Sequence, residues 1–74
     1  MIKIITGQFC SRCHMIAPKL KEYSEKKWYE YIEKDISAAT PEELGEATQL
    51  PVIWFDDRQV EFDEALSLIT NTNG

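Results

Sequence analysis

The chain has 74 residues, of which 43% are hydrophobic, so it can form one small domain around a single core. We expect a single domain over residues 1–74, with short connections and no room for a second domain. The formal net charge of −5 argues against a nucleic-acid partner, because binding a phosphate backbone needs clustered lysine and arginine.

The first half of the chain predicts a strand, a helix and a second strand. Ile2–Thr6 is a short β-branched run that ends at Gly7, which is typical of a buried strand. From Ser11 to about Lys26 apolar residues recur at helical spacing, and Pro18 should kink this helix or separate its first turn. Trp28–Asp35 is rich in aromatic residues and isoleucine, and it predicts the second strand.

A short helix is expected next. Thr40 can cap it, Pro41 suits the first helical position, and Glu43 would complete a capping box. The helix should cover about Pro41–Thr48, although Gly45 weakens it.

The C-terminal third predicts a β-hairpin and a last helix. The apolar run Val52–Phe55 and the segment Gln59–Phe62 should be its strands, joined by the polar turn Asp56–Arg58. Asp63 is expected to cap the last helix, and Asn71–Gly74 to form a frayed tail.

These elements predict an α/β fold in the order β-α-β-α-β-β-α. The first three form a right-handed βαβ unit, which implies a parallel pair of strands. The hairpin adds antiparallel strands. The expected result is a four-stranded mixed sheet flanked by helices.

Both cysteines and the only histidine lie together in Phe9-Cys10-Ser11-Arg12-Cys13-His14, between the first strand and the first helix. C-x-x-C is the spacing of a redox-active dithiol, and C-x-x-C-H is also the spacing for covalent haem attachment. Haem would need an opposite axial ligand, which the adjacent Met15 cannot supply, and a mostly helical chain. Zinc would need more ligands than two cysteines and one histidine, unless a dimer shared the site. His14 is expected to be a partly exposed helix residue, with a modest tuning role as the alternative.

The N-terminal apolar run, Met1–Thr6, is too short for the core of a secretion signal. No run approaches the roughly 18 apolar residues of a membrane helix. We therefore expect a cytoplasmic protein without a membrane partner. In that reducing compartment a close cysteine pair is more often catalytic or metal-binding than structural.

Thiol–disulfide exchange requires a thiolate, and a position at a helix N-terminus favours one. Arg12 would add a positive charge beside Cys10. Cys10 is expected to be the exposed nucleophile. Cys13 lies one helical turn deeper, so it is expected to resolve the mixed disulfide. Phe9 should form part of an exposed apolar docking surface beside Cys10.

The chain resembles the thioredoxin and glutaredoxin superfamily. Cys13–Leu20 reads C-x-M-I-A-P-x-L, as in the thioredoxin helix after its second cysteine, and Gln49–Val52 is similar to the segment with the family's cis-proline. The resemblance implies a minimal thioredoxin fold, close in length to glutaredoxins. It also implies that Leu50 and Pro51 bind substrate.

The same resemblance implies a protein-disulfide reductase that acts as a monomer through a Cys10–Cys13 disulfide, without any other cofactor. Its partners would be a disulfide-containing client protein, with ribonucleotide reductase as one candidate, and a reductant. A flavoprotein thioredoxin reductase and glutathione both remain open as the reductant. Ser11-Arg12 matches neither family. These residues are expected to tune the cysteine pair, Arg12 through its charge and Ser11 because it lacks the stiffness of proline. Glu61-Phe62 replaces the glycine pair of glutaredoxins, which argues against a glutathione site.

Several large side chains are interpreted as packing residues: Trp28, Tyr29 and Tyr31 in the core or on a strand face, and Trp54 and Met15 in the core. From a different class, the chain could be a thioredoxin-fold binding module whose thiols are not catalytic.

Overall fold

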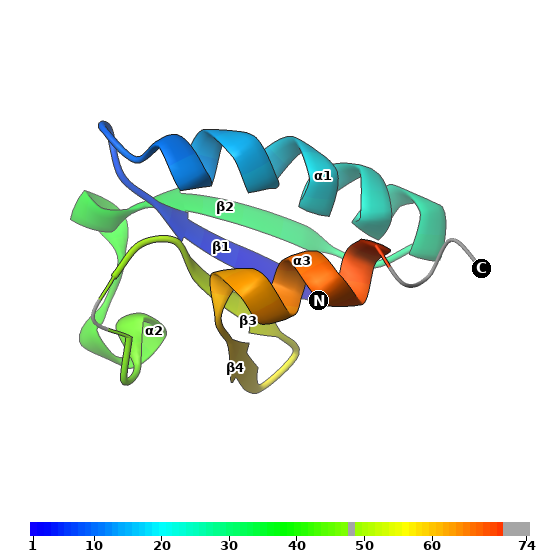
Figure 1. Cartoon of the computed structure of the whole chain (residues 1–74). Helices are drawn as coiled ribbons and strands as arrows, with labels where there is room; N and C mark the ends of the chain where they lie inside the picture. Colours follow the sequence, from blue (N-terminus) through cyan, green and yellow to red (C-terminus); the bar gives the residue numbers. More distant parts are fainter. Residues whose placement is uncertain (48, 71–74) are drawn as a thin grey trace.

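The computed structural model describes residues 1–47 and 49–70. The elements are β1 (Ile2–Thr6), α1 (Ser11–Lys27), β2 (Tyr31–Asp35), the 3₁₀ turn η1 (Ile36–Ala38), α2 (Pro41–Leu44), β3 (Val52–Phe55), β4 (Arg58–Val60) and α3 (Phe62–Thr70) (Figure 1). The sheet order is β2-β1-β3-β4, with β1 parallel to β2 and the other neighbouring pairs antiparallel. The predicted four-stranded mixed sheet is therefore confirmed. None of the described helices is long and apolar enough to cross a membrane.

The main core lies between the sheet and the pair α1 and α3, which cover the same face (Figure 1). Alternate residues of the central strands point toward these helices, because side chains of a strand alternate between faces. Ile2 and Ile4 of β1 and Ile53 of β3 are at most 1% exposed and pack with Ile16 and Leu20 of α1. This packing holds the N-terminal turn of α1 above the end of β1.

The opposite face of the sheet is covered by α2. Lys3 of β1 and Lys34 of β2 both donate to the Glu43 carboxylate of α2, with N–O distances of 2.8 and 2.7 Å. Trp54 of β3 donates its indole N–H to the Glu43 carbonyl at 2.7 Å. Gln59 of β4 donates to the Leu44 carbonyl at 3.2 Å. A helix of four residues is thus tied to all four strands.

The predicted second strand begins too early, because α1 continues to Lys27 and the strand starts at Tyr31. Trp28 ends the helix in the left-handed conformation (φ 61°), and the Tyr29 amide donates to the Ser24 carbonyl at 2.8 Å. This is a Schellman-type ending, which usually has glycine where this chain has tryptophan. Trp28 is 92% exposed and Tyr29 48% exposed, so the packing roles expected for them are wrong. Tyr31 alone of the three packs against the core.

The capping box of α2 is confirmed, since the Thr40 hydroxyl accepts from the Glu43 amide and the Glu43 side chain accepts from the Thr40 amide. The helix is shorter than predicted. It ends at Leu44, where Gly45 takes φ 58°. The predicted end, Thr48, lies outside the described residues.

The hairpin is confirmed, although its second strand is Arg58–Val60 and not Gln59–Phe62. Asp56 adopts φ 59° in the turn, a conformation that aspartate tolerates better than most residues. The last helix begins at Phe62, and the Glu61 carbonyl accepts from the Ala65 amide at 2.8 Å. Asp63 therefore lies in the first turn and is not the cap. The predicted tail, residues 71–74, lies outside the described residues.

Three expectations for side chains and helix shape are also corrected. Met15 is 48% exposed and does not belong to the core. Trp54 is only partly buried, because it faces α2 and not the main core. The helix α1 is one continuous element from Ser11 to Lys27, so the exposed Pro18 does not separate its first turn.

Candidate active site

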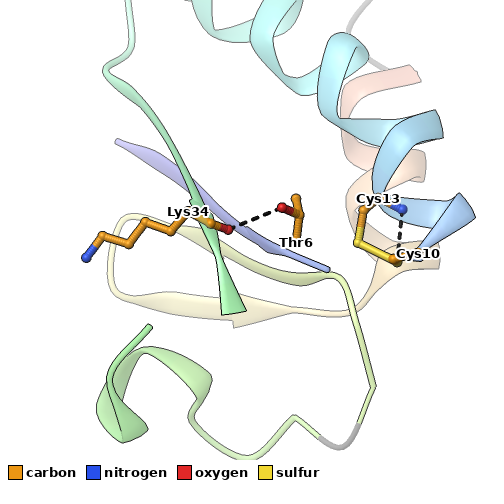
Figure 2. The surroundings of a disulfide bond; sticks show 4 residues. All are labelled: Thr6, Cys10, Cys13 and Lys34. Carbon is orange, nitrogen blue, oxygen red and sulfur yellow. Dashed lines mark hydrogen bonds between the residues drawn. A yellow bond between two sulfur atoms is a disulfide. The ribbon is translucent and has the colours of Figure 1, made fainter. Parts of the chain in front are cut away.

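The cysteine pair lies at the junction that the chain order predicts, between the end of β1 and the start of α1. The Thr6 hydroxyl donates to the Lys34 carbonyl at 3.3 Å and ties the ends of the parallel strands β1 and β2 together (Figure 2). The loop then turns back, with the Cys10 amide 3.4 Å from the Gly7 carbonyl. Functional groups commonly gather at the carboxyl ends of parallel strands, where loops meet helix N-termini.

Cys10 and Cys13 form a disulfide, with their Cα atoms 5.2 Å apart. Cys10 is the N-cap of α1: its backbone is extended, and its sulfur accepts the Cys13 amide at 3.2 Å (Figure 2). The positive end of the helix therefore points at the Cys10 sulfur, and this favours negative charge on that atom. A thiolate at Cys10 would be stabilised relative to the thiol.

The two cysteines differ in access to solvent. Cys13 is 1% exposed, as its deeper position predicts, whereas Cys10 is only partly buried. Phe9, next to Cys10, is 95% exposed, and Ser11 and His14 are also exposed. An approaching disulfide would therefore meet Cys10 and Phe9 first.

The structure brings the Leu50-Pro51 segment beside the cysteine loop. The Leu50-Pro51 peptide bond is cis, as the resemblance implied. A Cβ atom at Gly7 would lie 2.6 Å from the Leu50 Cδ1 and 3.9 Å from the Cys10 Cβ. Gly7 thus separates Leu50 from Cys10, and its lack of a side chain permits the close approach.

The Arg12 side chain lies over the ring of Phe62 at the start of α3, with its guanidinium carbon 5.6 Å from the ring centroid. This is the geometry of a cation–π contact. The sequence predicts the Arg12 charge beside Cys10. The contact with Phe62 holds this charge between α1 and α3. Sequence reasoning did not identify Phe62 as a site residue, because its only signal was an aromatic side chain between two acids.

A groove of about 590 Å³ extends from Arg12 along the Leu50-Pro51 segment. Its described lining comes from the start of α1, from the loop before β3, from Val52 of β3, from β4 and from the start of α3. The lining residues are Arg12, Glu46, Ala47, Gln49, Leu50, Pro51, Val52, Gln59, Val60, Glu61, Phe62 and Asp63. Sequence reasoning named Arg12 and Glu61 but missed Glu46 and Asp63 as lining residues, since nothing in their local pattern marks a site. Within residues 1–47 and 49–70, no three histidine, cysteine or acidic side chains gather where a metal ion could bind.

Among known proteins, the chain is similar in structure to a thioredoxin. No protein-family model matches the chain, and no curated protein matches its sequence. The X-ray structure of thioredoxin from Fasciola hepatica is similar, with a TM-score of 0.59 and 21% identity. The match covers 95% of this chain and 77% of that one. The chain therefore has a thioredoxin-like fold, with its C-x-x-C disulfide at the N-terminus of α1.

Proposed function

We propose that the chain is a protein-disulfide reductase that acts through Cys10 and Cys13. The Cys10 thiolate attacks one sulfur of a client disulfide, which forms a mixed disulfide and releases one client thiolate. The Cys13 thiolate then attacks the Cys10 sulfur, which forms the Cys10–Cys13 disulfide and releases the second client thiolate. Two electrons pass to the client, and the two client thiolates take up protons from solvent.

The observation that carries this proposal is the position of the Cys10 sulfur as the cap of α1, bonded to the buried Cys13. Lowering a cysteine pKa from about 8.5 to about 7 needs roughly 2 kcal/mol of preference for the anion. A helix N-terminus contributes about 0.3–1 kcal/mol at an exposed site and up to about 2 kcal/mol at a partly buried one. Cys10 is partly buried, so the helix can supply much of this preference.

Arg12 and Ser11 are proposed to tune the pKa of Cys10. Arg12 follows Cys10 by two positions, and its contact with Phe62 restricts where its charge can go. Ser11 leaves the first turn without the stiffness that proline would give there. Phe9, Leu50 and Pro51 are proposed to contact the client, because they are exposed beside Cys10 or line the groove next to it.

The proposed partners are a disulfide-containing client protein and a reductant that restores the dithiol. The reductant would be a flavoprotein thioredoxin reductase or glutathione, and ribonucleotide reductase is one candidate client. We propose that the protein acts in the cytoplasm as a monomer and needs no bound cofactor, because the disulfide itself carries the electrons.

Insulin reduction in the presence of dithiothreitol tests the proposal. The wild-type protein should accelerate precipitation of the insulin B chain at least about tenfold. This gain requires a little more than about 1 kcal/mol of transition-state stabilisation, because each kcal/mol is worth about fivefold in rate. Cys10→Ser and Cys13→Ser should both abolish the acceleration. His14→Ala serves as the control and should keep it, because this exposed side chain lies outside the proposed mechanism. A wild-type rate equal to that of both serine variants would instead favour a binding module with non-catalytic thiols.

A further inference from the structure

The groove beside the disulfide carries an excess of negative charge. Glu46, Glu61 and Asp63 line it and are exposed. Arg12 is the single cationic side chain among its described lining residues, and its guanidinium lies over the Phe62 ring. A ligand in the groove would therefore face three carboxylates and one guanidinium that already has an aromatic partner.

The start of α3 adds to the excess of negative charge at the groove. A helix N-terminus usually attracts anions through its free N–H groups and its dipole. Here Asp63 and Glu64 occupy the first turn, and Glu61 directly precedes the helix. Glu64 also pairs with Arg58 of β4. Carboxylates of the chain itself thus oppose binding of a ligand carboxylate at the end of α3 that borders the groove.

Glutathione fits this surface poorly. It is a small thiol with net negative charge, and it would have to place carboxylates among Glu46, Glu61 and Asp63. An extended peptide with lysine or arginine near its cysteine has the complementary charge. The volume of about 590 Å³ lies within the usual range of about 300–1,000 Å³ for small-molecule sites, so it is charge and not size that disfavours glutathione.

On the basis of the proposed function, we propose that this groove selects client disulfides whose flanking residues are cationic and disfavours anionic disulfides such as oxidised glutathione. The client segment lies along Leu50 and Pro51, with its sulfur at Cys10 and its basic side chains toward Glu61 and Asp63. Charge complementarity of this kind acts mainly on the rate of association, and salt weakens it.

The test uses the reduced wild-type protein and three cyclic peptide disulfides of equal length, with lysine, glutamine or glutamate on both sides of the cysteines. Oxidised glutathione is the fourth substrate. Single-turnover rates are measured at low and high ionic strength. At about 0.02 M salt the lysine peptide should react about tenfold faster than the glutamate peptide, and the ratio should approach one at about 0.5 M. Oxidised glutathione should react more slowly than the lysine peptide.

A matched pair of double variants locates the effect. Glu61→Gln with Asp63→Asn should lower the lysine-to-glutamate ratio to about threefold or less. Glu25→Gln with Glu30→Gln changes the net charge equally, at exposed positions at the far end of α1, and should keep the wild-type ratio.

The outcomes separate this proposal from the proposed function. Equal rates for the three peptides, or equal effects of the two double variants, would overturn the charge selection and leave the reductase activity intact. Failure to reduce any peptide would overturn both.

Discussion

Gly7 shapes the site at the scale of a single residue, because it leaves space that the Leu50 side chain occupies. A methyl group at this position would lie 2.6 Å from the Leu50 Cδ1. This contact is too close, so Leu50 would have to rotate or move away. The position of the Leu50-Pro51 segment thus depends on the absence of a side chain at Gly7 in the cysteine loop.

Gly7→Ala should therefore destabilise the fold by up to about 2 kcal/mol, since overpacking costs about 1–3 kcal/mol and the loss of chain freedom in the unfolded state offsets part of it. Leu50→Ala in the same chain should restore the space. Urea unfolding of the wild type, both single variants and the double variant measures the coupling, which we expect to exceed about 0.5 kcal/mol. Additive effects would mean that the two side chains do not meet.

Individual residues show where sequence reasoning succeeds and where it stops. The pairing of Cys10 with Cys13 follows from spacing, because residues three apart at a helix start share a face. Their proposed roles follow from position, because Cys13 lies one helical turn deeper. The outcome for Trp28 could not be anticipated, since a glycine normally marks a left-handed helix end and tryptophan gives no such signal. Arg12 has a partner distant in sequence, Phe62, and local pattern does not reveal such pairs.

Among elements, one side chain of α2, Glu43, joins this helix to both β1 and β2. The Glu43 carboxylate accepts from Lys3, Lys34 and the Thr40 amide while its side chain is only 13% exposed. Hydrogen bonds from the two lysines and from the backbone hold the pKa of Glu43 well below its ordinary value. The chain passes from α2 to Leu50 and Pro51, so this attachment also limits where the Leu50-Pro51 segment can lie.

Glu43→Gln keeps a side chain that can form the capping box but removes the charge. Because the pKa of Glu43 is lower in the folded state, its contribution to stability is complete above the ordinary glutamate pKa and is lost as the pH falls below it. The wild type should therefore be more stable than Glu43→Gln at pH 7. Their free energies of unfolding should converge as the pH falls below about 4.3.

Urea unfolding across this pH range measures the difference, and Glu42→Gln is the control. Glu42 is an exposed neighbour in the same turn, so its substitution should give a smaller difference at pH 7. A difference between the wild type and Glu43→Gln that stays constant from pH 7 to pH 3 would contradict the assigned role of the charge.

For the whole molecule, chain order predicts the sheet because βαβ handedness and a tight polar turn leave few arrangements for so short a chain. The ends of the elements were predicted less accurately than their order, since β2 and α2 are both shorter than predicted. The groove could not be predicted. Its described walls come from α1, the loop before β3, β4 and the start of α3, and only the folded chain brings their charges together.

Mass spectrometry of trapped mixed disulfides tests directly whether Cys10 attacks the client disulfide and Cys13 resolves the mixed disulfide. Reduced Cys13→Ser is mixed with the lysine-flanked peptide disulfide and analysed without reductant, beside Cys10→Ser and the wild type. One peptide should become attached to Cys10 of Cys13→Ser, and dithiothreitol should release it. The wild type should pass on to its own disulfide, and Cys10→Ser should remain unmodified. Attachment through Cys13 in Cys10→Ser, or no adduct on Cys13→Ser, would contradict the account.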